Sequence, residues 1–351
     1  MKAKLYSYWC RHFIFIIIFI ISCLLYGSNE YPVILVHGNA GWGRDEGLIY
    51  YWGGFQDLEG DLNSNGFDVR SASVGPFSSN WDRACELYAY IRGGTVDYGK
   101  AHSEKFGHER YGRTYEGIYK EWGEADYGGI NKIHLIGHSQ GGQTARLLVQ
   151  LLEEGMESEV EAVLGENSST DEINEAISEG RLSGLFAGIH NDWVKSVSTF
   201  ATPNDGTTMA DIANYGDGPL MFFAMQLGGI TGLESIDFID LKLDHWGLKR
   251  ESGESFYDYF KRVMGSSLWN PLGGATKDFS NYDLSTYGAR EMNTWVKDQA
   301  NVYYFSYSCK ITRRNTIGYN QIPMITLANP LFLPTATTIG AYLNYLTGIT
   351  Y

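Results

Sequence analysis

The stretch that decides the fold is Asn131-Lys-Ile-His-Leu-Ile-Gly-His-Ser-Gln-Gly-Gly-Gln-Thr-Ala-Arg146. An apolar run leads directly into Gly137-x-Ser139-x-Gly141 and then into residues that favour helix, which predicts a strand, a sharp turn and a helix. A serine between two such glycines can adopt a strained backbone conformation at the end of the strand, so that its hydroxyl points out of the sheet. The glycines have no Cβ, so the strand and the helix can approach closely around the turn.

Ser139 is therefore the candidate nucleophile, and the amide of Gln140, at the start of the predicted helix, is a candidate donor to an oxyanion. The motif also has an ordinary interpretation as a glycine turn, because the chain contains 42 glycines. The predicted strand before Ser139 and the predicted helix from Gln143 to Leu152 favour the catalytic interpretation.

Composition limits the classes of protein that the chain can belong to. The 351 residues are 44% hydrophobic, enough for a sizeable core in one large domain or two small ones. The formal net charge is −14 and there is no basic stripe, which argues against nucleic acid and against a polybasic contact with anionic membranes. Strands alternate with helical segments, a pattern typical of an α/β fold.

Residues 1–28 have the features of a secretory signal peptide. Two lysines and an arginine precede an apolar run from Phe13 to Leu25, and small residues follow it. A membrane-spanning helix needs about 20 apolar residues, so this shorter run favours cleavage and secretion over an uncleaved membrane anchor. Residues 29–351 are expected to form a single domain.

A second segment provides the other half of a candidate oxyanion hole. Residues 31–38 are predicted to form a short apolar strand, followed by a loop of small residues at 39–43. In α/β-hydrolases the loop after such a strand supplies the second oxyanion amide. Here that donor would be the backbone of Asn39. Without Ser139 the segment would be an ordinary strand and loop.

Two histidines, His102 and His108, lie six residues apart in a loop rich in glycine and aromatic residues. A glycine-rich backbone can fold back so that the imidazoles converge, and imidazole nitrogen and carboxylate oxygen are natural zinc ligands. Two loop histidines can equally be solvated without a metal. The spacing alone therefore leaves zinc binding open.

Two more segments depart from the alternation of strands and helices. Residues 153–188 are acidic and helical, which indicates solvated surface helices with no assigned chemistry. Pro219 to Leu233 is the most apolar stretch outside the strands and the N-terminal segment. It is either a buried core helix or a lid that covers an apolar site in water and offers its inner face to lipid.

Several motifs occur together between Tyr31 and Ser308, which is most of the mature chain. They are His37-Gly38 with Gly41-Trp42-Gly43, Tyr51-Trp52-Gly53-Gly54, Val74-Gly75-Pro76, Ser78 to Glu86, Gly93 to Gly99, Gly112 to Tyr115, Gly137 to Arg146, Ala201-Thr202-Pro203 with Asp205 to Thr208, and Lys242-Leu243-Asp244 with Trp246-Gly247-Leu248. In these motifs the chain resembles the thermoalkalophilic, zinc-containing bacterial lipases of the Geobacillus and staphylococcal type.

The resemblance implies an α/β-hydrolase fold with a mostly parallel central sheet, helices on both faces, a lid at about 209–233 and an extra zinc-binding subdomain. It also implies hydrolysis of acylglycerol esters at a lipid–water interface through Ser139. Where the family usually has phenylalanine in the oxyanion loop, this chain has Asn39, a change that retains the backbone amide. The family's zinc ligands are two aspartates and two histidines, which correspond here to Asp82, His102, His108 and Asp244.

The C-terminal part departs from the family pattern. Family members complete the catalytic triad with an aspartate and then a histidine in C-terminal loops, and this sequence has no Asp, Glu or His after Asp298. The last histidine is His245, and neither it nor His190 is favoured as a substitute base. We therefore expect a family domain that stops before the triad acid and base, and before the family's calcium ligands.

Two hypotheses follow. In the first, the chain derives from a secreted lipase that transfers an acyl group to Ser139 and then to water, with the base supplied by a missing C-terminal segment. In the second, it is a non-catalytic lipid-binding or structural relative that keeps the lid, the zinc and the serine. Both imply a neutral lipid or ester and zinc as ligands, calcium only with the missing segment, and no nucleic acid or protein partner.

Overall fold

The computed structural model of the protein describes residues 31–46, 50–213, 240–266, 268–270, 274–275, 277–308, 312–314 and 321–323. The expected signal peptide at 1–28 and the apolar stretch from Pro219 to Leu233 lie outside the described residues. Within the described ranges, no helix has both the length and the apolar character needed to cross a membrane.

A five-stranded sheet forms the centre of the fold. Its strands, in spatial order, are β11 (Tyr303–Tyr307), β8 (Val194–Phe200), β7 (Ile133–His138), β1 (Val33–Val36) and β2 (Val69–Ser71). Every neighbouring pair is parallel; Leu35, for example, lies opposite Ile136 on one side and Ser71 on the other. The expected parallel central sheet is therefore confirmed, and the C-terminal ends of its strands share one edge, where ligands gather in such folds.

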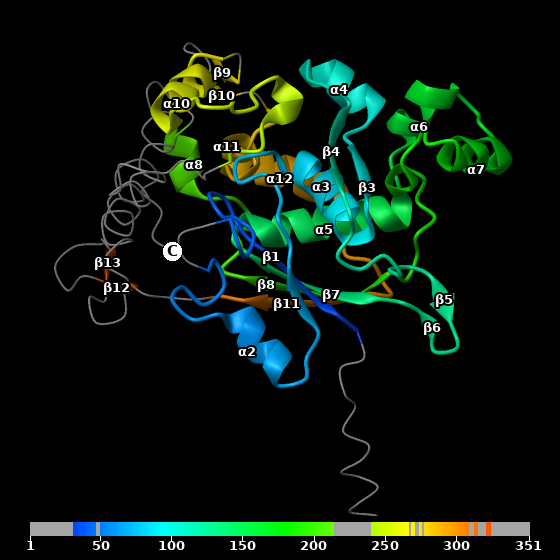
Figure 1. Cartoon of the computed structure of the whole chain (residues 1–351), viewed down its shortest axis with the longest axis horizontal. Helices are drawn as coiled ribbons and strands as arrows, with labels where there is room; N and C mark the ends of the chain where they lie inside the picture. The colour runs from blue at the N-terminus through cyan, green and yellow to red at the C-terminus, as the bar shows by residue number, and fades with distance from the viewer. Residues whose placement is uncertain are drawn as a thin grey trace, which may run out of the picture.

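Helices lie on both sides of this sheet (Figure 1). One face is covered by α3 (Asn80–Arg92), α5 (Gln140–Glu154) and α12 (Thr286–Trp295), and α2 (Leu58–Ser64) lies on the other side. The main core forms between the sheet and α5, where Ile34, Leu135, Val197, Leu148 and Leu151 are fully buried. The apolar residues of α5 recur at helical spacing, which gives the helix one face to bury against the strands.

A second layer lies beyond these helices (Figure 1). It contains an antiparallel pair of strands, β3 (Gly94–Asp97) and β4 (Tyr111–Tyr115), and α4 (Lys100–Phe106) connects them along the chain. It also contains η2 (Asp244–Trp246), α10 (Phe256–Met264) and α11 (Ser280–Asp283). A separate apolar cluster, including Trp42, Phe77, Leu243 and Tyr259, joins this layer to the loops that follow β1 and β2. This layer matches the extra subdomain that the sequence led us to expect.

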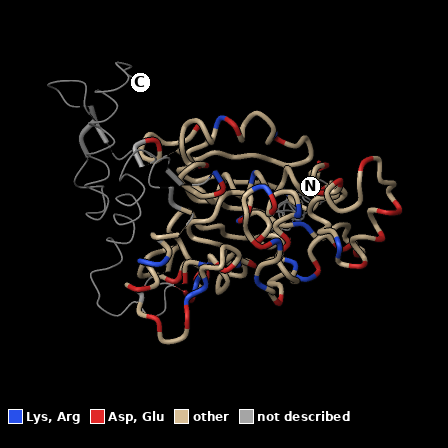
Figure 2. Tube along the Cα trace, turned by 90° about the horizontal axis from the view of Figure 1, so that it is seen from above, with Lys and Arg blue, Asp and Glu red and all other residues tan. Residues whose placement is uncertain are grey.

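The acidic stretch 153–188 forms α6 (Glu157–Leu164), α7 (Thr170–Ser178) and η1 (Gly184–Phe186). At the right-hand end of Figure 2, where Figure 1 places α6 and α7, the trace carries acidic residues and few basic ones. One acidic residue departs from the expected solvated surface: Glu159 is 2% exposed and accepts hydrogen bonds from the Ala101 and His102 N–H groups, both at 2.8 Å. This carboxylate therefore supports the start of α4.

The remaining described elements are short. They are β5 (Ala125–Asp126), β6 (Gly129–Ile130), α8 (Thr208–Ala213), β9 (Trp269–Asn270), β10 (Gly274–Ala275), β12 (Thr312–Arg314) and β13 (Gln321–Pro323).

Candidate active site and metal centre

The turn at Ser139 has the backbone geometry of a nucleophile held at the end of a strand. β7 ends at His138 and α5 begins at Gln140, and Ser139 between them has φ 53° and ψ −126°. A positive φ is strained for a residue with a side chain, so the surrounding structure must stabilise it. A Cβ at Gly141 would lie 2.2 Å from the Val36 carbonyl oxygen, which explains why the turn requires glycine there.

The loop after β1 packs directly against this serine. A Cβ built at Gly38 would lie 2.7 Å from the Ser139 Cβ. Among the described residues, the Asn39 N–H forms no hydrogen bond. Gln140 occupies the first position of α5, where an N–H has no intrahelical acceptor. The two amides selected from the sequence therefore remain available to an anion beside Ser139, on the positive end of a helix dipole.

Histidine side chains in the described part of the chain contact other groups and not the Ser139 hydroxyl. The His138 ring interacts with the Tyr51 hydroxyl, and the His190 ring stacks on Trp193 with centroids 3.9 Å apart. Burial and the nearby Arg92 lower the pKa of His190 to about 4. No hydrogen bond to the Ser139 hydroxyl occurs within the described ranges.

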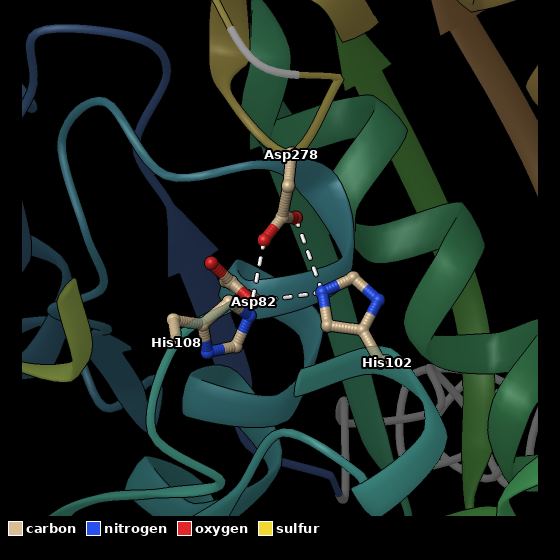
Figure 3. Close-up of side chains that lie close together, drawn as sticks. All are labelled: Asp82, His102, His108 and Asp278. Atoms are coloured by element: carbon tan, nitrogen blue, oxygen red, sulfur yellow. Dashed lines mark ion pairs between the residues drawn. The ribbon is translucent and has the colours of Figure 1, made fainter. Parts of the chain in front are cut away.

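Asp82, His102 and His108, three of the predicted zinc ligands, converge in one buried cluster (Figure 3). Asp82 lies in the first turn of α3, His102 in α4 and His108 just after α4. The two histidines therefore do not share a loop as expected, because residues 100–106 form a helix. The fourth member of the cluster is Asp278, which directly precedes α11.

Asp244 is not part of this cluster, so its assignment as the fourth ligand needs correction. Its carboxylate accepts hydrogen bonds from Arg113, which also binds Asp240, and this ion pair is partly exposed. The neighbouring His245 reaches the centre instead: its Nε2 lies 3.0 Å from Asp82 Oδ2. Asp278 replaces Asp244 as the second carboxylate.

The cluster has the dimensions of a tetrahedral metal site. His102 Nε2 lies 3.1 Å from Asp278 Oδ1 and 3.4 Å from Asp82 Oδ1, and His108 Nε2 lies 3.1 Å from Asp278 Oδ2. Tetrahedral Zn²⁺ with bonds of about 2.0 Å separates its ligand atoms by roughly 3.3 Å. Within the described part of the chain, the buried atoms Asp82 Oδ1, His102 Nε2 and His108 Nε2 form no hydrogen bond, although buried polar groups normally do. The residues present therefore fit a divalent cation such as zinc.

The charges of the cluster favour the same interpretation. Burial opposes the protonated form of His102, but Asp278 and Asp82 beside it outweigh that effect and raise its pKa to about 9. The histidines in turn lower the pKa of Asp278 against the effect of its burial. Two anionic carboxylates held this close inside a protein require positive charge between them, which protons on the imidazoles or a metal ion can supply.

Sequence reasoning missed Asp278 and the supporting residue His245. Asp278 lies in a short segment with no metal-ligand spacing to the other ligands, 170 positions after His108. From the sequence, His245 is considered only as a substitute base and is not favoured for that role. Its ring fixes the second oxygen of Asp82 and packs against Tyr98 with centroids 4.4 Å apart, so it orients the ligand from outside the cluster.

The fold is that of an α/β-hydrolase. It has a parallel sheet with flanking helices, and its strained serine lies between a strand and a helix, beside the loop that carries the Asn39 amide. The chain belongs to the family described as "Lipase-like, C-terminal domain", whose model matches residues 29–342.

Named relatives agree with this family. The chain is 38% identical over 315 residues to a lipase of Staphylococcus epidermidis, and the matched region covers 89% of this chain and 42% of that protein. The chain thus spans less than half the length of that relative. Among solved structures, EstA from Clostridium botulinum is 50% identical with a TM-score of 0.76, covering 90% of this chain and 69% of that one. Staphylococcus hyicus lipase is 36% identical with a TM-score of 0.70, covering 90% and 75%.

Proposed function

We propose that this chain is an ester hydrolase of the lipase class that cleaves acylglycerols, or related esters of neutral lipids, through Ser139. The observation that carries the proposal is the strained Ser139 turn, with φ 53°, placed against the loop that holds the free Asn39 amide. Ser139 Oγ would attack the ester carbonyl carbon, and the alcohol would leave as the acyl–enzyme forms. A base outside the described residues would take the Ser139 proton, because a neutral serine is a poor nucleophile.

The two amides have a specific task in this reaction. Attack turns the carbonyl oxygen into an oxyanion, and the N–H groups of Asn39 and Gln140 would stabilise it. Removing one such donor in a well-studied protease costs about 10²- to 10³-fold in turnover, so correctly placed amides carry much of the rate. The acyl–enzyme is then released by water along the same path.

We infer that the buried cluster of Asp82, His102, His108 and Asp278 holds zinc. Four protein ligands fill a tetrahedral shell and leave no position for water or substrate, which is the arrangement of a structural site. When bound, the ion joins α3 and α4 to the segment before α11. The first 28 residues, with basic positions ahead of an apolar run, support secretion of the mature chain.

The experiment is covalent labelling of the chain with a fluorophosphonate that carries a fluorophore. We expect slow labelling of the wild-type chain at Ser139, because no described residue serves as its base, and none in Ser139→Ala. Ser178→Ala, at an exposed helix position, is the matched control and should label like the wild type. Peptide mapping that places the label on another serine, or equal labelling of Ser139→Ala, would refute the proposal and favour a non-catalytic lipid-binding role.

A further inference from the structure

The peptide unit between His37 and Gly38 is held by side chains at both of its polar groups. Its carbonyl oxygen accepts a hydrogen bond from Arg83 Nη2, and its N–H donates to the Tyr51 hydroxyl over 2.8 Å. A peptide unit is planar, so fixing its C=O and its N–H fixes the orientation of the plane. This unit immediately precedes the one that carries the Asn39 amide.

The next peptide unit, between Gly38 and Asn39, is held by the His37 ring. Nδ1 lies 2.9 Å from the Gly38 carbonyl oxygen, to which it can only donate, and Nε2 accepts from the Val74 N–H over 3.3 Å. These contacts select one neutral tautomer, and burial together with Arg83 lowers the pKa of His37. In a trans peptide the N–H points opposite to the carbonyl, so holding the Gly38 oxygen directs the Asn39 N–H to the other side.

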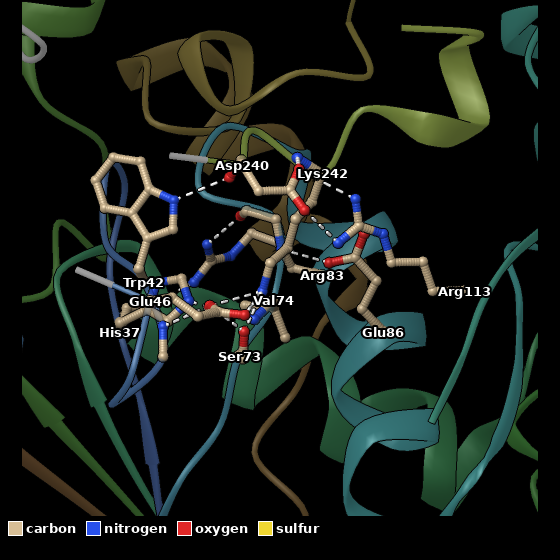
Figure 4. A network of polar contacts seen from close by, with 12 residues as sticks. His37, Trp42, Glu46, Ser73, Val74, Arg83, Glu86, Arg113, Asp240 and Lys242 are labelled. Carbon is tan, nitrogen blue, oxygen red and sulfur yellow. Dashed lines mark hydrogen bonds and ion pairs between the residues drawn. The ribbon is translucent and has the colours of Figure 1, made fainter. Parts of the chain in front are cut away.

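Arg83 connects this loop to the nucleophile helix; Figure 4 shows its side chain in a network that also contains His37, Val74 and Glu86. Its fully buried guanidinium donates to three acceptors on three elements: the His37 carbonyl after β1, the Gly75 carbonyl after β2 at 2.6 Å, and Thr144 Oγ1 in α5 at 3.0 Å. A planar fork of five donors can reach three acceptors at once, whereas a lysine ammonium in the same place cannot. The position of the loop relative to Ser139 therefore depends on this one side chain.

Tyr51 makes the corresponding connection from the other side. Its hydroxyl accepts from Gly38 N–H and lies 2.5 Å from Nδ1 of His138, the residue before Ser139. Since the hydroxyl has one hydrogen, it donates that hydrogen to a neutral His138. The loop and the serine turn are thus joined through one oxygen atom.

We propose that Arg83 and Tyr51 are positioning residues that aim the Asn39 amide at the oxyanion formed on Ser139. The proposal rests on the proposed function, because it assigns these contacts a task in ester hydrolysis. Among the described residues neither side chain hydrogen-bonds to Ser139; each holds the His37–Gly38 peptide. The geometry predicts that loosening either contact lowers the rate of the covalent step and leaves the binding of the ester unchanged.

The test uses two conservative variants of the full chain. Arg83→Lys keeps the charge and loses the fork, and Tyr51→Phe removes only the hydroxyl. Arg146→Lys is the matched control, because Arg146 also lies in α5 but its side chain donates to Asn293 and not to the loop. Thermal unfolding and bound zinc are measured for each variant, and where Arg83→Lys does not fold, Tyr51→Phe decides the outcome.

The first readout is amide hydrogen exchange of the loop, which does not require activity. The Ala40 and Gly41 amides are protected by the Pro76 and Gly38 carbonyls, at 2.8 and 3.1 Å, and neither the Arg83 guanidinium nor the Tyr51 hydroxyl hydrogen-bonds to them. The Tyr51 ring packs beside Gly41, and Tyr51→Phe keeps that ring. We expect their exchange to rise at least ~10-fold in both variants and to stay unchanged in the control. Unchanged exchange in both variants overturns this proposal. The result is separate from the proposed function, which fails if the wild type does not label at Ser139.

The second readout is the rate of Ser139 phosphonylation at saturating fluorophosphonate, kinact, together with the concentration for half-saturation, KI. Misplacement of a catalytic group by ~1 Å can cost on the order of 10²-fold. We expect kinact to fall roughly 10- to 100-fold with KI unchanged. A looser loop with an unchanged kinact, or a change confined to KI, would show a merely structural role and overturn the proposal.

Discussion

Replacing Asp278 by asparagine should remove the stabilisation that zinc gives the protein, and replacing Asp244 should not. Asp278 Oδ1 and Oδ2 each lie 3.1 Å from a histidine Nε2, so this carboxylate faces both imidazoles of the cluster. Asparagine has a similar shape but supplies a neutral, weaker ligand. Asp244→Asn is the matched control, since that carboxylate belongs to the Arg113 ion pair outside the cluster.

The magnitude follows from linkage between metal binding and folding. With free zinc at 100 times the Kd of the wild type, bound metal contributes about 2.7 kcal/mol. Loss of a direct ligand should weaken binding at least about 100-fold, since even supporting residues cost 10- to 100-fold. At the same zinc concentration the contribution then falls to roughly 0.4 kcal/mol. For a chain of this length the difference of about 2.3 kcal/mol corresponds to a Tm change of roughly 3 °C.

The assay is thermal unfolding of each variant in a chelator and in buffered zinc. The measured quantity is the Tm increase on adding zinc, so a variant's effect on the metal-free protein cancels. The wild type and Asp244→Asn should show the full increase, while Asp278→Asn should show almost none. The assignment of the cluster is refuted if Asp278→Asn keeps the wild-type increase, or if Asp244→Asn loses it.

Three further outcomes are expected. The pKa of His190 is lowered to about 4 in the folded state, against about 6.5 when unfolded, so its neutral form stabilises the protein above pH 6.5 and that stability is lost as pH falls toward 4. Between pH 7 and pH 5 the free energy of unfolding, measured in urea, should fall by about 2 kcal/mol more in the wild type than in His190→Gln. An equal fall in both proteins would contradict this. Gly141→Ala should destabilise by about 3 kcal/mol, because its Cβ would meet a backbone oxygen at 2.2 Å, whereas Gly265→Ala, with nothing nearer than 3.4 Å, should cost far less in the same unfolding assay. Glu159→Gln should weaken zinc binding about 10-fold in a chelator competition, and an unchanged Kd would remove this carboxylate from the support of α4.

The parts of the site that lie within one local pattern could be predicted from the sequence. An apolar run, a Gly-x-Ser-x-Gly turn and a helical segment determine their own geometry over about 15 residues, and β7 and α5 lie on either side of Ser139 as expected. The position of Asn39 beside the serine turn could be predicted for the same reason, since it follows the strand next to β7. In both cases the position depends on backbone conformation, which short-range sequence controls.

The fourth metal ligand could not be predicted in this way. The segment from 242 to 248 does lie beside the metal cluster, so the family motif in this segment predicted the correct region of the chain. However, η2 is a tight turn, and it directs His245 toward Asp82 while Asp244 turns to Arg113. Asp278 lies near the histidines because the start of α11 is bonded to the loop before α3, with the Ser280 N–H donating to the Phe77 carbonyl at 3.0 Å. No local pattern records such a tertiary contact.

The first turn of α3 explains why the metal centre and the candidate active site occur together in this fold. Successive residues of a helix point about 100° apart, so neighbouring side chains serve different surroundings. Asn80 binds Gln143 and Thr144 of the nucleophile helix, Asp82 faces the metal cluster, and Arg83 holds the loop of the Asn39 amide. A cation that fixes Asp82 therefore fixes the backbone from which Arg83 extends. A cation at the proposed site would in this way help to keep the loop that carries Asn39 rigid. The arrangement buries a guanidinium that must keep all three of its acceptors.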